Sequence, residues 1–346
     1  MKYLNKTKLV AAFGSVALAA TLSAPANAAV VLGGADGWEV SYGGFVNLFY
    51  TQSDWEYDAG GNEDSAHLNE GLLPAFHTLT VKTPEINGLK GTGQITFAPD
   101  SSGTKGKDLN KGGSEIDMRE VFFNVEGDFG TISAGRTLAL YQRQAILKDY
   151  TLFGVGASAG ADTGGTSLGR IGFGYVYPDF RTRFTYKTPD INGFVLEVGI
   201  FDPNESAPGG LFGSGNTQET DTPQFQAEAT YNTAFEGGNF NVWASFIWQE
   251  MEIVGVDDVE LFGYNIGVDV NFGGFNLMGS YYDGEALGTI FLNDLGNFGC
   301  TATTCAEADN DGYIIQGSYT FNGTTKVGVS YGESTQDGNA AFGISG

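Results

Sequence analysis

The chain has 346 residues, of which 41% are hydrophobic and 17% are charged, and its 41 acidic against 17 basic residues give a net charge of −24. This balance argues against nucleic-acid binding, which needs clustered cations to neutralise phosphates. No stretch reaches the roughly 18 apolar residues of a membrane-spanning helix, and 13% aromatic residues are too many for a disordered chain. A β protein rich in glycine and aromatic residues remains.

The first 28 residues have the three parts of a secretory signal peptide. Three lysines at positions 2, 6 and 8 form a positive start, the segment 9–22 is largely apolar, and an Ala-Asn-Ala sequence at 26–28 offers small residues for cleavage. The apolar stretch is too short to span a bilayer. We therefore expect an exported chain, with 1–28 as the signal peptide and 29–346 as one mature domain.

Alternation of apolar and polar side chains with a period of two residues runs through most of the mature chain. In 261–272, one parity carries only large apolar residues, from Phe262 to Phe272, whereas the other is mainly Gly, Asn and Asp. This is the period of a strand and not of a helix. It predicts thirteen strands, at about 38–51, 75–83, 89–98, 116–126, 130–136, 180–188, 193–201, 224–231, 239–249, 261–271, 275–282, 313–321 and 325–332.

The connections between these strands alternate in length. Tight turns such as 84–88 and 322–324 are separated by long connections at 52–74, 99–115, 137–179, 202–223, 250–260 and 283–312. Hairpins with tight turns at one end and long loops at the other are typical of outer-membrane β-barrels. The apolar parity is then expected to face lipid, and the polar parity is expected to line a wet lumen.

The segment 119–136 reads REVFFNVEGDFGTISAGR. It closely resembles the hairpin that precedes the constriction loop in Gram-negative trimeric porins: an apolar strand, a Gly-x-Phe-Gly turn, and a short strand ending in Gly-Arg. The segment 186–194 resembles the next hairpin of that family. The resemblance implies an all-β fold, an antiparallel transmembrane β-barrel of the 16-stranded porin type, located in the outer membrane of a Gram-negative bacterium. It also implies that 137–179, the longest connection, folds into the lumen.

Two features depart from that family. The chain stops at Gly343-Ile344-Ser345-Gly346 instead of ending in a strand with a terminal aromatic residue. Thirteen strands is also an odd number, whereas bacterial single-chain barrels have an even one. Both departures follow if the sequence is truncated at its C-terminus, so we expect 29–346 to be an incomplete barrel that lacks the last three strands.

Ten charged residues are candidates for the pore constriction. Alternation places Arg181, Arg183 and Lys187 on the polar side of their strand, and the same test turns Lys82 and Lys90 toward the lumen. Arg143, Lys148 and Asp149 belong to the 137–179 loop. Arg119 and Arg136 share parity with apolar neighbours, so their place at the narrow zone is implied by the family resemblance alone.

These charges allow two interpretations. Either the cations favour small anions in a narrow pore, where nearby charges outweigh distant ones, or they pair with acids such as Glu120 and Glu197 and leave a weakly selective pore. We expect passive diffusion of ions and small hydrophilic solutes. The first alternative is a substrate-specific, anion-preferring channel, and the second is a surface adhesin or receptor barrel. The expected partners are outer-membrane lipid, two further copies in a homotrimer and the permeating solutes, but no nucleic acid.

The cysteines and histidines point away from catalysis and metal binding. Cys300 and Cys305 lie close together in one loop of an exported chain, which predicts a local disulfide. They make a poor zinc site, because zinc takes three or four ligands and His67 and His77 are distant. Neither histidine has a catalytic motif beside it, so we expect no enzyme, no cofactor and no metal.

Overall fold

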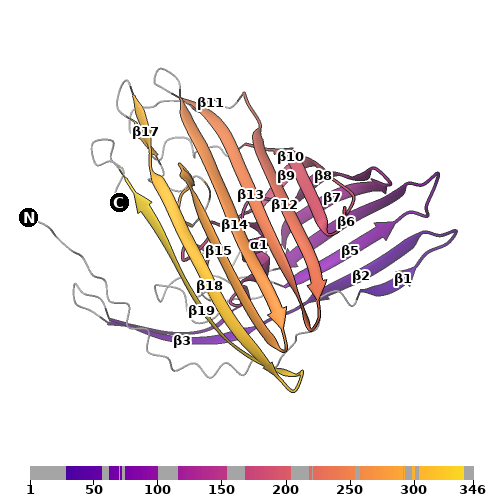
Figure 1. Ribbon diagram of the computed structural model, residues 1–346, viewed down its shortest axis with the longest axis horizontal. Helices are drawn as coiled ribbons and strands as arrows, with labels where there is room; N and C mark the ends of the chain where they lie inside the picture. Colours follow the sequence, from indigo (N-terminus) through magenta and orange to yellow (C-terminus); the bar gives the residue numbers. More distant parts are fainter. Residues whose placement is uncertain are drawn as a thin grey trace, which may run out of the picture.

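The computed structural model describes residues 29–56, 62–69, 71, 75–99, 116–153, 168–203, 218–219, 221–253, 258–290, 292, 298–300 and 304–338. The signal peptide predicted at 1–28 lies outside this part of the chain. The described residues form a 15-stranded antiparallel sheet in which fourteen strands follow one another in chain order, while β11 lies off this path and pairs with β13 (Figure 1). Its strands are β1 (Val30–Gly33), β2 (Glu39–Phe45), β5 (Phe76–Lys82), β6 (Lys90–Pro99), β7 (Ile116–Gly127), β8 (Gly130–Leu138), β9 (Phe180–Lys187), β10 (Phe194–Phe201), β11 (Gln218–Glu219), β12 (Gln224–Phe235), β13 (Gly238–Ile253), β14 (Val259–Phe272), β15 (Phe275–Glu285), β18 (Asp309–Phe321) and β19 (Thr325–Asp337).

The strands predicted from alternation are confirmed. Each of the thirteen segments overlaps a strand of the sheet, but the first one, 38–51, is not a single strand: β2 belongs to the sheet, whereas β3 (Phe49–Glu56) lies outside it. The structure adds strands whose sequences do not alternate. Polar β4 (Asn62–Asn69) pairs with β3 as a separate hairpin, and β16 (Phe298–Cys300) pairs with β17 (Cys305–Glu307). Cys305 is disulfide-bonded, and the β16–β17 pairing sets Cys300 opposite it.

The tight turns follow from Asn-Gly pairs that accept positive φ. Asn87 and Gly88 have φ of 54° and 77°, and Asn192 and Gly193 have φ of 56° and 92°. Asparagine and glycine reach this region at low cost, which is why they dominate such hairpin turns. At Gly193 a Cβ atom would also lie 2.0 Å from the carbonyl oxygen of Asn232. This turn therefore requires glycine for space as well as for its backbone conformation.

The two faces of the sheet are inverted relative to a soluble protein. On β14, Asn265 is 1% exposed, whereas its neighbour Ile266 is 52% exposed. The same contrast separates buried Gln226 from exposed Phe225 on β12, and buried Gln316 from exposed Ile315 on β18. A face of exposed aliphatic and aromatic side chains with polar residues behind it is suited to lipid outside and a polar lumen inside.

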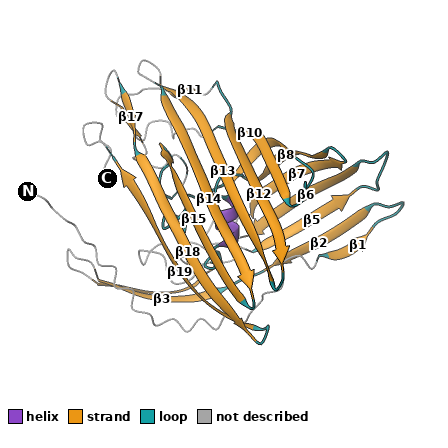
Figure 2. Cartoon of the chain, in the orientation of Figure 1, coloured by secondary structure: helices purple, strands orange, loops and turns teal. Residues whose placement is uncertain are grey.

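The sheet is strongly curved, and the β12–β19 part crosses in front of the β2–β9 part (Figure 2). Its edges are β1 and β19, which are not paired with one another among the described residues. The one helix of the described chain, α1 (Arg143–Lys148), lies on the concave side, behind β13 and β14 in this view. The described part of the connection from β8 to β9 that contains α1 is thus inside the curve of the sheet.

Candidate functional site

The connection between β8 and β9 is attached to the inner, polar face of the sheet. The side-chain oxygen of Gln226 accepts hydrogen bonds from the backbone N–H groups of Leu140 and Tyr141, both at 2.8 Å. On the other side of α1, Gln316 accepts from the N–H of Tyr150 at 2.8 Å and donates to the carbonyl of Lys148 at 2.9 Å. The wall therefore satisfies the Lys148 carbonyl, which has no intrahelical partner at the end of α1, and the backbone N–H groups of the residues that flank the helix.

Apolar packing holds the helix on this face as well. Ala145 and Ile146 of α1 join a buried cluster with Trp243, Met278 and Ile314, which come from β13, β15 and β18. A large aromatic residue on a polar strand face thus has a role here, because it provides the surface on which the helix rests. The ammonium of Lys148 lies 5.4 Å from the centre of the Trp243 ring, a cation–π distance.

Arg143 ties α1 to the wall through two buried carboxylates. Its Nη2 lies 2.6 Å from Glu228 on β12 and 2.8 Å from Glu197 on β10, and the two carboxylate side chains are 3% and 8% exposed. Burial opposes the charged guanidinium, but Glu228 and Glu197 outweigh it and raise the pKa of Arg143 above its ordinary value. Arg143, predicted to line the constriction, is therefore mostly occupied in holding the loop.

Asp149 closes the loop on itself. Its buried carboxylate accepts hydrogen bonds from the N–H and hydroxyl of Thr151, the N–H of Arg170 and the hydroxyl of Tyr175, at 2.7–2.9 Å. Burial and the neighbouring Asp149 raise the pKa of Tyr175 well above its ordinary value, so this phenol stays a donor. Asp149 was predicted to be a pore charge, but its oxygens are taken up by the loop.

The loop also reaches the far end of the sheet. Tyr150 hydrogen-bonds to Asn276 on β15, and its ring lies 4.3 Å from the ammonium of Lys326 on β19. Arg170 donates to the hydroxyl and the carbonyl oxygen of Ser330 on β19, and the N–H of Gly174 donates to the Ser334 hydroxyl. The connection therefore contacts the inner face from β10 to β19.

Three of the remaining predicted residues lie on the inner face of β9. Arg183 donates to the carbonyl of Leu138 at 3.0 Å and lies 3.4 Å from Glu197. Arg181 lies 3.7 Å from Asp179, and Lys187 is opposite Glu197 in the β9–β10 register.

The other four predicted residues lie elsewhere. Lys82 pairs with Glu39 and Lys90 with Glu85, so both lie beside the tight turn at 84–88 and away from α1. Arg119 pairs with Asp117, whose side chain is 56% exposed.

Arg136 lies at the end of the β7–β8 pairing. It is opposite Val121 on β7 and Thr182 on β9, and Val121 belongs to the exposed apolar face. Its charge is nevertheless within electrostatic reach of Tyr177 in the loop and of Arg181 on the inner face of β9. Its place at the narrow zone therefore stays a prediction.

Gln226, Gln316 and Trp243 were not predicted as site residues. Their common signal is a large hydrogen-bonding or aromatic side chain on the polar parity of a strand.

Within the residues that the structure describes, no helix is long and apolar enough to cross a bilayer. Nor do these described residues bring together three or more His, Cys, Asp or Glu side chains in a way that could hold a metal ion.

Known proteins with a similar sequence pattern or fold are porins and outer-membrane channels. A family model described as Gram-negative porin matches residues 14–343. No curated protein sequence matches the chain. Among solved structures, the chain is similar to an anion-selective porin from Comamonas acidovorans, with 17% identity and a TM-score of 0.58 over 88% of this chain and 80% of that one. It is also similar to the outer membrane channel DcaP of Acinetobacter baumannii, with 14% identity and a TM-score of 0.62 over 89% and 82% of the two chains. The third is OmpF of Salmonella typhi in complex with daunomycin, with 15% identity and a TM-score of 0.53 over 86% and 79%.

At these identities the solved structures establish the β-barrel fold alone. The family model covers nearly the whole chain, including the β7–β8 hairpin, the inward connection and β19. The chain belongs to the Gram-negative porin family.

Proposed function

We propose that this porin is a weakly selective pore, narrowed by the connection between β8 and β9, which works as a homotrimer. As a Gram-negative porin, the protein lies in the outer membrane and forms a water-filled channel for passive diffusion of ions and small hydrophilic solutes. Its function is accordingly transport, and catalysis forms no part of the proposal.

The observation that carries weak selectivity is the pairing of charges around α1. Arg143 contacts both Glu228 and Glu197, and Arg183 contacts Glu197 as well. These side chains are all under one-fifth exposed, so a passing ion meets a nearly neutral cluster. Charges that neutralise one another at short range create little field a few ångströms away.

A substrate-specific, anion-preferring channel is the second candidate. The Comamonas acidovorans structure is titled an anion-selective porin, but a likeness of 17% identity concerns the fold. The pairing of Arg143 and Arg183 with carboxylates argues against an anion site at α1, because the charge of each guanidinium is already offset by Glu228 or Glu197.

Solute flux distinguishes the two candidates. In liposomes that contain the purified protein, we expect the rates of entry of neutral sugars to rise linearly with concentration and to fall smoothly with solute size. Saturation of flux by one class of anion at low concentration would refute the general pore and support a specific channel. Liposomes without protein are the control.

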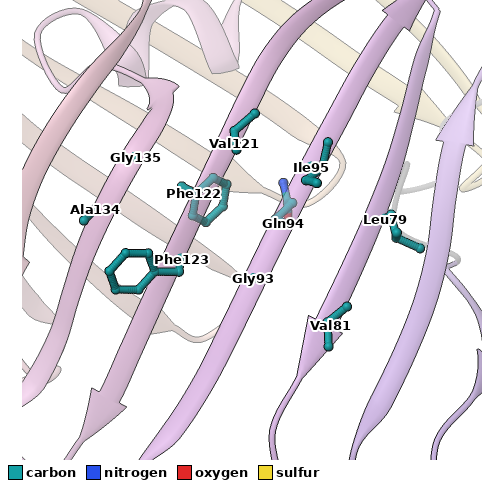
Figure 3. A pocket seen from close by; sticks show the side chains of 10 residues that line it. All are labelled: Leu79, Val81, Gly93, Gln94, Ile95, Val121, Phe122, Phe123, Ala134 and Gly135. Carbon is teal, nitrogen blue, oxygen red and sulfur yellow. The ribbon is translucent and has the colours of Figure 1, made fainter.

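The homotrimer is supported by an apolar hollow on the outer face of β5–β8 (Figure 3). The hollow has a volume of about 440 Å³, and its lining includes Leu79, Val81, Ile95, Val121, Phe123 and Ala134. The wall that continues from it includes β2 and β5, which have seven residues each. A transmembrane strand needs about 9–11 residues, so this wall is better suited to contact protein than to span lipid alone.

A bulky substitution in the hollow tests the assembly. Ala134→Trp should convert heat-sensitive oligomers to monomers on gels run in mild detergent, because the indole fills the space that a neighbouring copy would occupy. Ala229→Trp, on the outer parity of β12, is the matched control and should leave oligomers intact. Equal oligomer content in both variants would rule out β5–β8 as the contact surface.

A further inference from the structure

Glu120 is a carboxylate on the inner face of β7 that is held only by neutral donors. Its Oε2 accepts from the amide of Gln94 at 2.9 Å and the hydroxyl of Thr96 at 2.8 Å, and its Oε1 accepts from the hydroxyl of Thr137 at 2.7 Å. An ionised carboxylate offers about four acceptor sites. Three donors therefore fix its position and leave it room to contact a solute.

No cation within the described ranges forms an ion pair with Glu120. Arg143 and Arg183 are the nearby cations on the inner face, and they contact Glu197 and Glu228 at 2.6–3.4 Å. Two arginines thus balance two glutamates. Glu120 lies within electrostatic reach of Arg183 but is the carboxylate left over, so this group of five carries one net negative charge.

Apart from Arg143, the charged residues in the described part of the loop are two cations, Lys148 and Arg170, and two acids, Asp149 and Asp179, so they add no net charge that offsets it. Lys148 has a half-buried ammonium over Trp243, and its nearest acids are Asp269 and Glu228. Asp269 lies on the inner parity of β14, where it accepts a hydrogen bond from the Asn276 amide at 2.6 Å. Lys148 and Asp269 therefore carry opposite charges within electrostatic reach of each other.

Glu120 is also at the height where the passage begins to narrow. Its donor Thr137 lies two residues before Ala139, where the chain leaves the wall and turns inward. Glu120 is half-buried, so part of its surface faces the lumen. A fixed charge matters most at such a narrow, low-dielectric place.

We propose that Glu120 sets the ion preference of the pore, and that the pore favours small cations over anions. This rests on the proposed diffusion function, since it names the solute class that passes the same constriction most easily. The basic residues of 119–183 suggested the opposite preference, but the structure pairs most of those that face inward. The charge that remains available to a solute at the loop root is a carboxylate.

Reversal potentials of the purified protein in planar bilayers test this directly. In a tenfold KCl gradient we expect the wild type to pass K⁺ about three- to tenfold better than Cl⁻, an order of magnitude set by one charge at a few ångströms. Glu120→Gln should bring the ratio close to one. The preference should fall as salt rises from 0.05 to 1 M, because screening shortens the reach of the carboxylate.

Glu126→Gln is the matched control. Glu126 shares the strand and the parity of Glu120, but it is opposite Lys90, beside the tight turn. Six residues of strand place it roughly 20 Å away, beyond the reach of a screened charge. We expect its permeability ratio to be that of the wild type.

A second variant covers the case in which Glu120→Gln fails to insert. Glu120→Cys should regain cation preference after labelling with a sulfonatoethyl reagent, and should turn toward anions after labelling with a trimethylammonioethyl reagent. An anion-preferring wild type, or a Glu120 variant with an unchanged ratio, would overturn the role of Glu120. Absence of any conductance from the wild type would instead refute the diffusion function itself.

Discussion

Removal of the Arg143 side chain is the most incisive test of how the narrowing segment is held. Arg143→Ala leaves Glu197 and Glu228, at 8% and 3% exposure, with their main counter-charge gone. Removing one partner of a buried ion pair costs about 3–5 kcal/mol. Here the cost applies to the docked loop and not to the sheet, because the glutamates can regain water if the loop lifts away. A loss of this size weakens docking by roughly 10²- to 4 × 10³-fold.

Single-channel recording measures the consequence. The loop keeps its contacts with Gln316, after the last residue of α1, and with Ser330. We therefore expect only the first turn of α1, around position 143, to detach from the wall, and the channel to have a larger and noisier conductance. Arg119→Ala is the control, because its partner Asp117 is 56% exposed and such pairs contribute less than about 1 kcal/mol. Adding Glu197→Gln and Glu228→Gln to Arg143→Ala removes the unpaired buried charges, so the conductance noise should fall part of the way back to the wild-type level. An Arg143→Ala channel with wild-type conductance, noise and protease resistance of the loop would show that the ion pairs do not hold the loop.

Other consequences can be measured on the same protein. Burial lowers the pKa of Lys148 from its usual 10.5, and Asp269 and Glu228 oppose this shift only in part. The side chain therefore binds its proton less tightly when the loop is docked than when it is exposed to water. Stability of the docked loop, followed by protease resistance, should therefore rise with pH between that lowered pKa and 10.5, and Lys148→Met should abolish this rise. Gln226→Leu should weaken the loop root by about 1–3 kcal/mol for each of the two N–H groups left unpaired, visible as faster hydrogen exchange at Leu140 and Tyr141. Ile266→Lys should cost about 2–4 kcal/mol of folding free energy in lipid vesicles if Ile266 faces hydrocarbon, and near-zero cost would contradict the inverted faces. Reduction of the Cys305 disulfide should leave conductance unchanged, because β16 and β17 form their own two-stranded sheet.

The sheet could be predicted from the sequence because its faces are defined by local alternation. The alternation from Phe262 to Phe272 indicates which side chains share the apolar face, and this requires no knowledge of the neighbouring strands. Polar β4 carries no such signal, so its pairing with β3 could not be predicted from alternation. Local alternation therefore predicted where most strands lie, but it did not predict that β3 pairs with β4.

The site was much less predictable, because its contacts join residues far apart in sequence. Arg143 and Glu228 are 85 residues apart, and Gln316 and Lys148 are 168 apart. Composition placed arginines near the constriction, but whether an arginine is free or paired depends on carboxylates from other strands.

The attachment of the inward segment to β19 has a consequence for biogenesis. Arg170 and Ser330 are separated by 160 residues, as are Gly174 and Ser334. The narrowing element cannot be fully seated until the last described strand is in place, since its contacts with Lys326, Ser330 and Ser334 arrive with that strand. A partly assembled chain would therefore be a wider and leakier hole than the finished one, which makes completion of this edge a safeguard for the permeability barrier of the cell envelope.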